Sequence, residues 1–532
     1  MKIIFRLLPA VIFLVSTFAA HAQKPDIITD VSINKYRRLL HLISIYYIDT
    51  VNQQQIVEKA IVGTLKTLDP HSYYISKEEY KAATEPLEGN FDGIGIEFNI
   101  LEDTLIVVSP LSGGPSEKVG LMSGDRIIAV DGKSVANINL TIEKVHSLLR
   151  GPKGSQISVG VKRGSSLIDF EIVRDKIPIN SVDAAYEIKP GLAYLKLSRF
   201  AKSSMSEIEE SFSKFRNPKS LILDLRGNGG GFMNIANALA DQFFGDGKLL
   251  VYTEGRFFPV QKEMSTDKGL FKNGNLVVLI DEASASASEI VSGAIQDQDR
   301  GIIIGRRSFG KGLVQTEFPM GDGSAVRLTI ARYHTPSGRA IQSPYEKGKT
   351  EQYYKNLSDR VMAEAFSADS IVFPDSLKYN TLVNNRTVYG GGGIMPDIYV
   401  PLDTSKYSKY SGALNRKNVV FQFVSTYMDK NRKTFGNKYR TLDAFKQSFA
   451  VSDDLFGEMI AFGEKEGVPI DEEGIKISGT HIRQYMKALI ARSLFDYSAY
   501  FMIMNEGDSV YEKAIEVLDN WDKYKKECLK EK

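Results

Sequence analysis

Strands and helices alternate between residues 176 and 400, and this alternation constrains the fold more than any other feature of the sequence. The stretches GLAYLKLSRF, KSLILDLRG and NLVVLIDE read as strands, and the last is apolar enough to be buried on both faces. FMNIANALADQFF and ASEIVSGAIQD, which follow the second and third of these strands, read as helices. This order predicts an α/β domain with a mostly parallel central sheet.

The chain is too long for one ordinary core, because its 532 residues suggest three or four domains of about 150 residues each. Residues 23–88 have the apolar spacing of helices, and the character changes to short strands at residue 89. The α/β domain occupies residues 176–405, with a polar insertion at 346–385. Residues 406–532 read as charged helices. The sequence therefore predicts several α/β and helical domains in series.

The first 22 residues predict a cleaved export signal. Lys2 and Arg6 precede or flank an apolar run, LLPAVIFLVSTFAA, whose 14 residues fall short of the roughly 20 that span a bilayer. Ala20-His21-Ala22 has the small-x-small pattern of a cleavage site. The alternative is a retained N-terminal anchor. We expect an exported protein, periplasmic or secreted, with no stable membrane insertion after cleavage.

Charge and cysteine content exclude several classes of partner and site. Loss of residues 1–22 lowers the formal net charge from +2 to 0, which gives no reason to expect a nucleic acid or an anionic membrane as a partner. Cys528 is the only cysteine, so the chain has no disulfide framework. A lone terminal cysteine also argues against a thiol nucleophile or a zinc–thiolate site.

Residues 89–175 resemble a PDZ domain. They contain short strands, a Gly-Leu-x-x-Gly-Asp-x-Ile turn from Gly120 to Ile127, a Val-Asp-Gly-Lys motif and a helical segment in the order of that module. A PDZ groove takes a peptide as an added strand and holds its terminal carboxylate on backbone N–H groups. Gly93, Ile94, Gly95 and Ile96 are the expected cradle, since glycines let N–H groups turn toward an anion. The alternative is that the glycines only make a tight turn.

The stretch SASASE, residues 284–289, lies where a buried strand gives way to a helix. Such a turn exposes side chains at the sheet edge and directs helix N–H groups outward. Its small residues leave room for a substrate, so a serine here is a candidate nucleophile. The residues alone leave an alternative open, in which Ser284 or Ser288 is simply the N-cap of the helix.

Lys311, in RSFGKGLVQTEF, is the candidate base for such a serine. None of the five histidines of the mature chain has a setting that suggests pairing, and we expect His71 to be a packed or capping residue. A lysine is a poor base near pH 7 unless burial lowers its pKa from about 10.4. Flanking glycines let the lysine enter a crowded site, and the amide of Gln315 could orient its amine.

The stretch DLRGNGGG, residues 224–231, is the candidate oxyanion hole. It lies between a strand and a helix, and its glycines around Asn228 predict an irregular turn with free N–H groups. A phosphate-binding loop would need a lysine and then a serine or threonine after the glycines. The sequence GNGGG also differs from the dinucleotide-binding pattern GxGxxG, so both nucleotide alternatives fail.

Taken together, DLRGNGGG, SASASEI, SFGKGLVQ and YHTPSGRAIQ resemble the carboxyl-terminal processing peptidases, tail-specific serine proteases with a Ser-Lys dyad. The resemblance covers about residues 35–400. It implies a crotonase- and ClpP-like α/β core with an inserted PDZ domain and helical N- and C-terminal regions. Its motifs place the nucleophile at Ser286 and the general base at Lys311, 25 positions later, with Gln315 as the orienting partner. They place the oxyanion hole at the N–H groups of Ala287 and of Gly229 or Gly230. Asp297 matches an acidic residue that we expect to be structural.

The resemblance implies an endopeptidase that cuts protein or peptide substrates near free C-termini through an acyl-enzyme, without a metal or an organic cofactor. The PDZ domain would bind the substrate tail and gate the site. The C-terminal helices are open to roles in homo-oligomer or adaptor contacts. The competing hypothesis is a non-catalytic binding protein built on a crotonase-like core, which would have no reason to keep Ser286, Lys311 and Gln315 together.

Overall fold

A computed structural model describes residues 30–101, 103–111, 113–122, 124–368 and 371–530, so the predicted export signal lies outside the described residues. The described residues form two compact units, divided between residues 64 and 65, which we describe separately. Within the described ranges, no helix combines the length and the apolar character needed to cross a bilayer.

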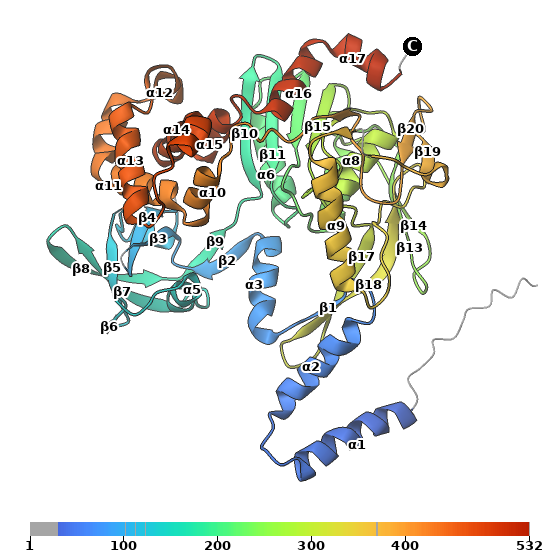
Figure 1. The fold of residues 1–532 in the computed structure, drawn as a ribbon, viewed down its shortest axis with the longest axis horizontal. Coiled ribbons are helices and arrows are strands. Elements are labelled where there is room, and N and C mark those ends of the chain that lie inside the picture. The colour runs from blue at the N-terminus through green and yellow to red at the C-terminus, as the bar shows by residue number, and fades with distance from the viewer. Residues whose placement is uncertain (1–29, 102, 112, 123, 369–370, 531–532) are drawn as a thin grey trace, which may run out of the picture. The chain divides into compact units, whose positions relative to one another are not determined.

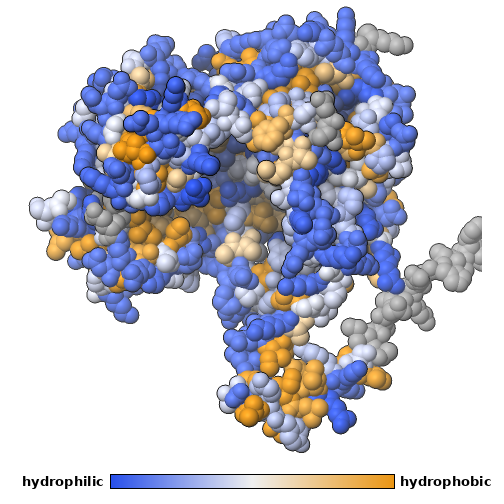
Figure 2. Space-filling model, viewed as in Figure 1, coloured by the Kyte–Doolittle hydropathy of each residue, from blue (hydrophilic) through white to orange (hydrophobic). Residues whose placement is uncertain are grey.

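The first unit contains helices α1 (Asp30–Tyr46) and most of α2 (Gln53–Leu65). Both were predicted as helices, and this is confirmed. No residue of α1 is buried, and in α2 only Leu65 is buried. Figure 2 shows apolar residues gathered over these helices. The exposed large apolar side chains of α1 are Val31, Ile33, Tyr36, Leu39, Leu42, Ile45 and Tyr46.

A six-stranded sheet forms the centre of the second unit. Its strands, in spatial order, are β10 (Val182–Lys189), β11 (Leu192–Leu197), β12 (Ser220–Asp224), β15 (Asn275–Ile280), β16 (Ile302–Gly305) and β21 (Ile398–Tyr399). Strands β10 and β11 are antiparallel, and every later pair of neighbours is parallel. The mostly parallel sheet predicted from the strand–helix alternation is therefore confirmed.

Alternate side chains of the central strands face two different hydrophobic cores, because successive residues of a strand point to opposite faces. Leu221 and Leu223 pack with α6 (Ser204–Lys214), α7 (Met233–Asp241) and α8 (Ala287–Asp297) on one face. Ile222 packs on the other face in a core closed by α16 (Ser509–Asp519) and α17 (Trp521–Cys528) (Figure 1). The last helices of the chain thus complete the α/β domain.

A second, five-stranded sheet lies in the same unit and is antiparallel. It consists of β1 (Tyr73–Ile75), β13 (Leu249–Glu254), β14 (Gln261–Met264), β17 (Leu313–Pro319) and β18 (Ala325–His334). Strand β17 pairs with β18 along its whole length, and no described strand pairs with its other edge. Helix α3 (Lys77–Glu88) follows β1 and begins with a capping box between Ser76 and Glu79.

A smaller β-rich module interrupts the chain between α3 and β10, at the place predicted for the PDZ domain. Its elements are β3 (Ile96–Leu101), β4 (Thr104–Pro110), α4 (Pro115–Lys118), β5 (Arg126–Val130), β6 (Lys133–Ser134), α5 (Ile142–Leu149), β7 (Gln156–Arg163) and β8 (Ser166–Val173). They enclose their own core. The chain enters and leaves through an antiparallel pair, β2 (Asn90–Gly93) and β9 (Asp175–Pro178).

The helices after residue 408 form a further cluster with a separate core. They are α10 (Lys409–Arg416), α11 (Val419–Lys438), α12 (Leu442–Ser448), α13 (Asp453–Lys465), α14 (Glu472–Leu494) and α15 (Tyr497–Met504). The predicted helical region is thus confirmed in its secondary structure, and it divides into this cluster and the two helices that cover the central sheet.

The segment read as a polar insertion packs more closely than that description suggests. It holds α9 (Thr350–Glu364), the 3₁₀ turn η2 (Asp375–Leu377) and β19 (Lys378–Asn380), which pairs with β20 (Thr387–Tyr389). Tyr353 of α9 is buried. The Arg360 guanidinium donates to the carbonyls of Ser308 and Gly392, each at 2.9 Å. Helix α9 therefore supports the loop that carries Lys311.

Candidate active site

Ser286 is the N-cap residue of α8, at the turn that leaves β15. Its backbone is left-handed, with φ +56° and ψ −111°, a conformation that a residue with a side chain rarely adopts. The alternative that Ser284 or Ser288 caps the helix is wrong. Their hydroxyls donate instead to the carbonyls of Leu225 (2.8 Å) and Asn228 (2.9 Å), because the glycine loop lies against this turn.

The loop at Asn228–Gly231 lies so close to Ser286 and Phe200 that two of its positions need glycine. At Gly230, where φ is +102°, a Cβ atom would lie 2.9 Å from Cβ of Ser286. At Gly231 it would lie 2.2 Å from the carbonyl oxygen of Phe200. A side chain at either position would strain or block the site.

Two backbone N–H groups beside Ser286 have no acceptor among the described residues, those of Gly229 and Ala287. The N–H of Gly230 is donated to Oδ1 of Asn228 at 2.9 Å. Of the two glycines considered from the sequence, Gly229 is thus the one whose N–H is free here. Free N–H groups at a helix N-terminus favour a negatively charged oxygen.

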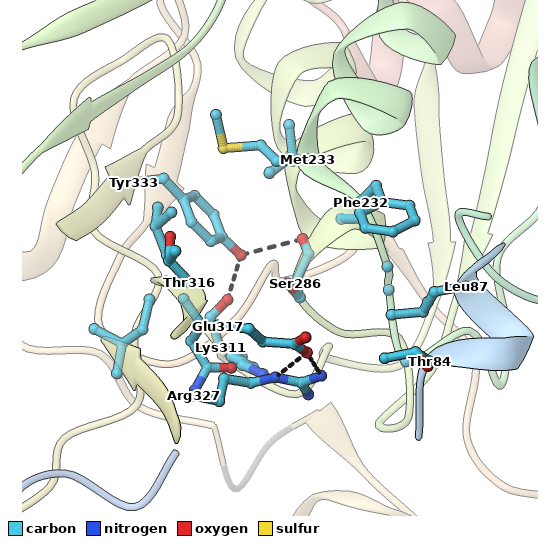
Figure 3. A pocket seen from close by; sticks show the side chains of 18 of the residues that line it. Thr84, Leu87, Phe232, Met233, Ser286, Lys311, Thr316, Glu317, Arg327 and Tyr333 are labelled. Carbon is cyan, nitrogen blue, oxygen red and sulfur yellow. Dashed lines mark hydrogen bonds and ion pairs between the residues drawn. The ribbon is translucent and has the colours of Figure 1, made fainter. Parts of the chain in front are cut away.

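Lys311 lies in the wall of the same cavity as Ser286 (Figure 3). Burial lowers the pKa of its amine below the usual lysine value, and the positive charge of Arg327 lowers it further, while Glu289 and Asp69 oppose the shift. The Gln315 amide nitrogen donates to the backbone carbonyl of His71. No hydrogen bond within the described residues joins Gln315 to Lys311.

Glu289 connects Ser286 with Lys311, and the sequence interpretation gave it no role. Its buried carboxylate accepts from the N–H groups of Ser286 (2.8 Å) and Lys311 (2.9 Å). It also accepts from the N–H of Gly310 and the hydroxyl of Ser308, each at 2.6 Å. Burial raises the pKa of this carboxyl, and these donors act against that rise. A glutamate three residues after a serine at a helix start is a capping-box pattern, which could have revealed it.

Tyr333 makes a second connection between the same two residues. Its hydroxyl contacts the backbone carbonyls of Ser286 and Lys311 (Figure 3). The side chain is buried, and burial raises the pKa of the phenol, so it remains a neutral donor. The motif YHTPSGRAIQ contained this residue, but its strand reading gave no sign of a contact with residues far along the chain.

The cavity in front of Ser286 measures about 800 Å³ and is open to solvent. Helix α3 contributes Thr84 and Leu87 to one wall, and β17 contributes its unpaired edge to another (Figure 3). Arg327 and Glu317 form an ion pair in this cavity. A hydroxyl, a buried amine and two free N–H groups in one cleft are the parts that acyl transfer requires.

Asp297, expected to be structural, lies at the far end of α8. It forms a fully buried ion pair with Arg339 (2.7 Å) and accepts from the N–H of Ser337 (2.9 Å). Both contacts fix the segment that follows β18. Its place in the fold agrees with a structural role.

The four predicted residues of the PDZ cradle line one small cavity of about 160 Å³ between β3 and α5. The N–H groups of Ile94 and Gly95 have no acceptor among the described residues. Arg150 also lines this cavity, stacks over the ring of Phe91 at 4.6 Å and pairs with Glu85 of α3. The cavity therefore has an apolar wall, free N–H groups and one cation.

Comparison with known families assigns three parts of the chain. Peptidase family S41 matches residues 191–349, the PDZ domain family matches residues 93–173, and a family of unknown function matches residues 410–496.

Across the described residues, no three histidine, cysteine, aspartate or glutamate side chains gather as a metal site would require.

For two curated relatives, the match to this chain covers most of the relative's own length. A carboxy-terminal-processing protease of Bartonella bacilliformis is 36% identical over 64% of this chain and 80% of the relative. The carboxy-terminal processing protease CtpA of Bacillus subtilis is 31% identical over 67% of this chain and 76% of the relative. Among solved structures, the photosystem II D1 C-terminal processing protease is 30% identical, covering 57% of this chain and 83% of that one with a TM-score of 0.32.

The two family matches and the curated relatives define a PDZ-containing serine-type peptidase. The chain belongs to peptidase family S41, among the carboxy-terminal processing proteases.

Proposed function

We propose that this protein is an exported endopeptidase that cleaves protein substrates near their C-termini, with Ser286 as the nucleophile and Lys311 as the general base. The observation that carries the proposal is the position of Ser286. It lies at a strained helix N-terminus in the cavity that Lys311 also lines, next to the unpaired N–H groups of Gly229 and Ala287. The export part rests on the sequence pattern of residues 1–22.

The chemistry follows from these groups. The neutral amine of Lys311 takes the hydroxyl proton of Ser286 as its oxygen attacks the scissile carbonyl. The N–H groups of Ala287 and Gly229 hold the oxyanion of the tetrahedral intermediate. Lys311 then gives the proton to the departing amine, which leaves an acyl-enzyme on Ser286. Water, deprotonated by Lys311, releases the new C-terminus and restores the serine.

The base must be neutral, and this requirement sets the pH dependence. Burial lowers the pKa of Lys311, so the neutral form appears at a lower pH than for an exposed lysine. Activity rises as the pH increases through that lowered pKa. The acidic limb of kcat/KM therefore lies below the usual lysine range.

The PDZ module supplies substrate binding in this proposal. A substrate tail joins the edge of β3, and the N–H groups of Ile94 and Gly95 hold its carboxylate. Arg150 lines this groove and pairs with Glu85 on α3. Residues Thr84 and Leu87 of the same helix line the catalytic cavity. A bound tail that attracts Arg150 changes the contact between Arg150 and Glu85. Because Glu85 lies on the helix that forms one wall of the catalytic cavity, this change supports gating of the site.

A digestion assay tests the proposal. The protein and its Ser286→Ala and Lys311→Ala variants are incubated with an unfolded protein that ends in an apolar residue, and the products are identified by mass spectrometry. Cleavage by the parent but by neither of these two variants, first near the substrate C-terminus, is the expected result. Ser292→Ala is the matched control, because that serine lies in the same helix and its hydroxyl donates to the carbonyl of Ser288.

Two results would contradict it. Cleavage by all variants at the parental rate would place the nucleophile elsewhere. A parent that binds the substrate through the PDZ groove but does not cut it would favour the non-catalytic binding protein.

A further inference from the structure

The turn Asp69–Ser72 lies against β17 and β18, through contacts with Gln315 and Thr329. The carboxylate of Asp69 accepts from the N–H groups of His71 (2.9 Å) and Ser72 (3.0 Å) and from the hydroxyl of Ser72 (2.6 Å). It also accepts from the hydroxyl of Thr329 in β18 at 2.9 Å. Thr329 is the partner of Gln315 in the β17–β18 register. The turn is therefore fixed directly beside Gln315.

This turn sets the orientation of the Gln315 amide. The amide nitrogen of Gln315 donates to the backbone carbonyl of His71. An amide whose NH₂ group is engaged on one side presents its oxygen on the other. That oxygen can accept from the amine of Lys311, as the sequence interpretation requires of Gln315.

The imidazole of His71 occupies the same buried region. Its ring lies edge-on to Tyr353 of α9, with centroids 5.4 Å apart and an interplanar angle of 84°, and 6.5 Å from Phe309. His71 is 6% exposed, and its Nε2 is buried without a hydrogen-bond partner among the described residues. An apolar aromatic ring would make the same packing contacts without a buried nitrogen, so packing alone does not explain a histidine at this position.

Burial, together with the positive charge of Lys311, keeps the ring neutral. Burial lowers the pKa of His71 to about 4, and the positive charge of Lys311 contributes to the lowering while Asp69 opposes it. Tyr353, the titratable residue of α9 against the ring, has a pKa raised to about 12 and is neutral. At neutral pH His71 is thus neutral, in a buried region that also holds Phe309, two residues before Lys311, and the Gln315 amide.

We propose that His71 is a positioning residue for the general base. Its carbonyl fixes the amide of Gln315, and its neutral imidazole accepts a hydrogen bond that holds the amine of Lys311 in line with Ser286. This inference rests on the proposed Ser286–Lys311 chemistry and adds a third group that orients the lysine.

Substitution of His71 separates this role from packing. His71→Phe keeps a ring against Tyr353 and removes the nitrogen. We expect kcat to fall by about 10- to 100-fold with little change in KM, because the amine is no longer held in place. The acidic limb of kcat should also move to lower pH, since an acceptor stabilises the ammonium more than the amine. His71→Gln returns an acceptor near the Nε2 position, so it should partly restore both kcat and the pH of the acidic limb.

His481→Phe is the matched control. That ring also lies against a tyrosine, Tyr407, with centroids 4.8 Å apart, and burial lowers its pKa too. It lines a different cavity, so kcat and the acidic limb should stay parental. If His71→Phe does not fold, His71→Leu replaces it in the comparison with His71→Gln.

The outcomes distinguish this inference from the proposed function. If Ser286→Ala cleaves like the parent, the serine–lysine chemistry fails and this inference fails with it. If Ser286→Ala is inactive while folded His71→Phe keeps the parental kcat and pH limb, only the role of His71 is overturned. Equal losses in His71→Phe and His71→Gln with an unshifted limb would also overturn it, since they would indicate packing alone.

Discussion

Ser286 is held in its unusual conformation by contacts on both sides. Its N–H is donated to Glu289 and its carbonyl receives the hydroxyl of Tyr333. A left-handed residue with a side chain costs about 1–3 kcal/mol, and such strain persists only where surrounding contacts impose it. Here the strain directs the side chain of Ser286 into the cavity at the start of α8.

The strain predicts a difference in stability between two variants of Ser286. Ser286→Gly should be more stable than Ser286→Ala by about 1 kcal/mol, because glycine adopts a positive φ without steric cost and alanine does not. The midpoint of urea unfolding, measured for both, gives the comparison. At Ser292, inside α8, the order should reverse, since glycine weakens a helix interior. Equal stability of the two Ser286 variants would show that the conformation carries no strain.

Glu289 predicts a coupled loss of stability and turnover. Glu289→Gln replaces one acceptor oxygen with an NH₂ group that faces the N–H groups of the same cage, which leaves buried donors unpaired at a cost of about 1–3 kcal/mol each. We expect a lower unfolding midpoint, and a kcat reduced by at least 10-fold in the folded fraction because Ser286 and Lys311 lose their shared anchor. Glu282→Gln is the control, because this partly buried carboxylate near the same turn pairs with Arg306 and contacts neither Ser286 nor Lys311. A parental kcat in folded Glu289→Gln would contradict the anchoring role.

The sequence indicated some of these residues and not others for a physical reason. Ser286, Lys311 and the glycine loop belong to short motifs whose local composition already departs from ordinary strands and helices. Tyr333 and His71 act through contacts with residues far along the chain, so no local pattern marks them. Glu289 is part of SASASE, yet three of its four partners, Ser308, Gly310 and Lys311, belong to a second segment that only the tertiary fold brings beside it.

At the scale of elements, α3 is placed between the two proposed binding regions. One part of it lines the catalytic cavity, and Glu85 on the same helix pairs with Arg150 at the rim of the PDZ groove. Glu85 is 7% exposed, so this ion pair is largely shielded from water. Shielded pairs are costly to break from one side, which makes α3 sensitive to what occupies the groove.

The pair predicts non-additive effects on turnover. Arg150→Ala and Glu85→Gln should each change kcat for tailed substrates, and the double variant should resemble either single one, because both remove the same contact. The control is the exposed pair Lys153–Asp175 on the stem of the module, whose side chains are 60% and 41% exposed. Loss of the Lys153–Asp175 pair should leave kcat unchanged. Strictly additive effects of the first two substitutions would contradict the coupling through α3.

Element types were easier to predict than element packing. The alternation of strands and helices was sufficient to predict the central sheet, because the spacing of apolar residues and the length of each segment distinguish buried strands from the helices between them. Helix α9 was read as part of a polar insertion, since most of its residues are polar. Its contacts are made by single residues such as Tyr353 and Arg360. So few buried residues do not produce the apolar repeat by which a packed helix is recognised in a sequence.

At the scale of the whole second unit, the end of the chain returns to the catalytic domain. Val510, Tyr511 and Leu518 of α16 pack on the central sheet. Asp508, the N-cap of α16, pairs with Arg226 of the DLRG motif at 2.9 Å. Arg226 also pairs with buried Asp224 at the end of β12, directly before the glycine loop. The last helices are thus part of the structure that supports the proposed oxyanion hole.

This link predicts that the C-terminal segment stabilises the catalytic domain through one charge. Asp508→Asn keeps a side chain that caps α16 about equally well, so the change isolates the ion pair with Arg226. Loss of the pair should lower the free energy of unfolding by about 1–3 kcal/mol, because Arg226 is only 15% exposed and loses a charged partner. Asp519→Asn, in α16 but paired with Lys189 at a site where both are nearly half exposed, should change it by less than about 0.5 kcal/mol. Urea unfolding measures both, and equal midpoints would mean that α16 is held by its apolar contacts alone. A selective fall in the Asp508→Asn midpoint would instead make the DLRG motif the point where the end of the chain and the glycine loop stabilise each other.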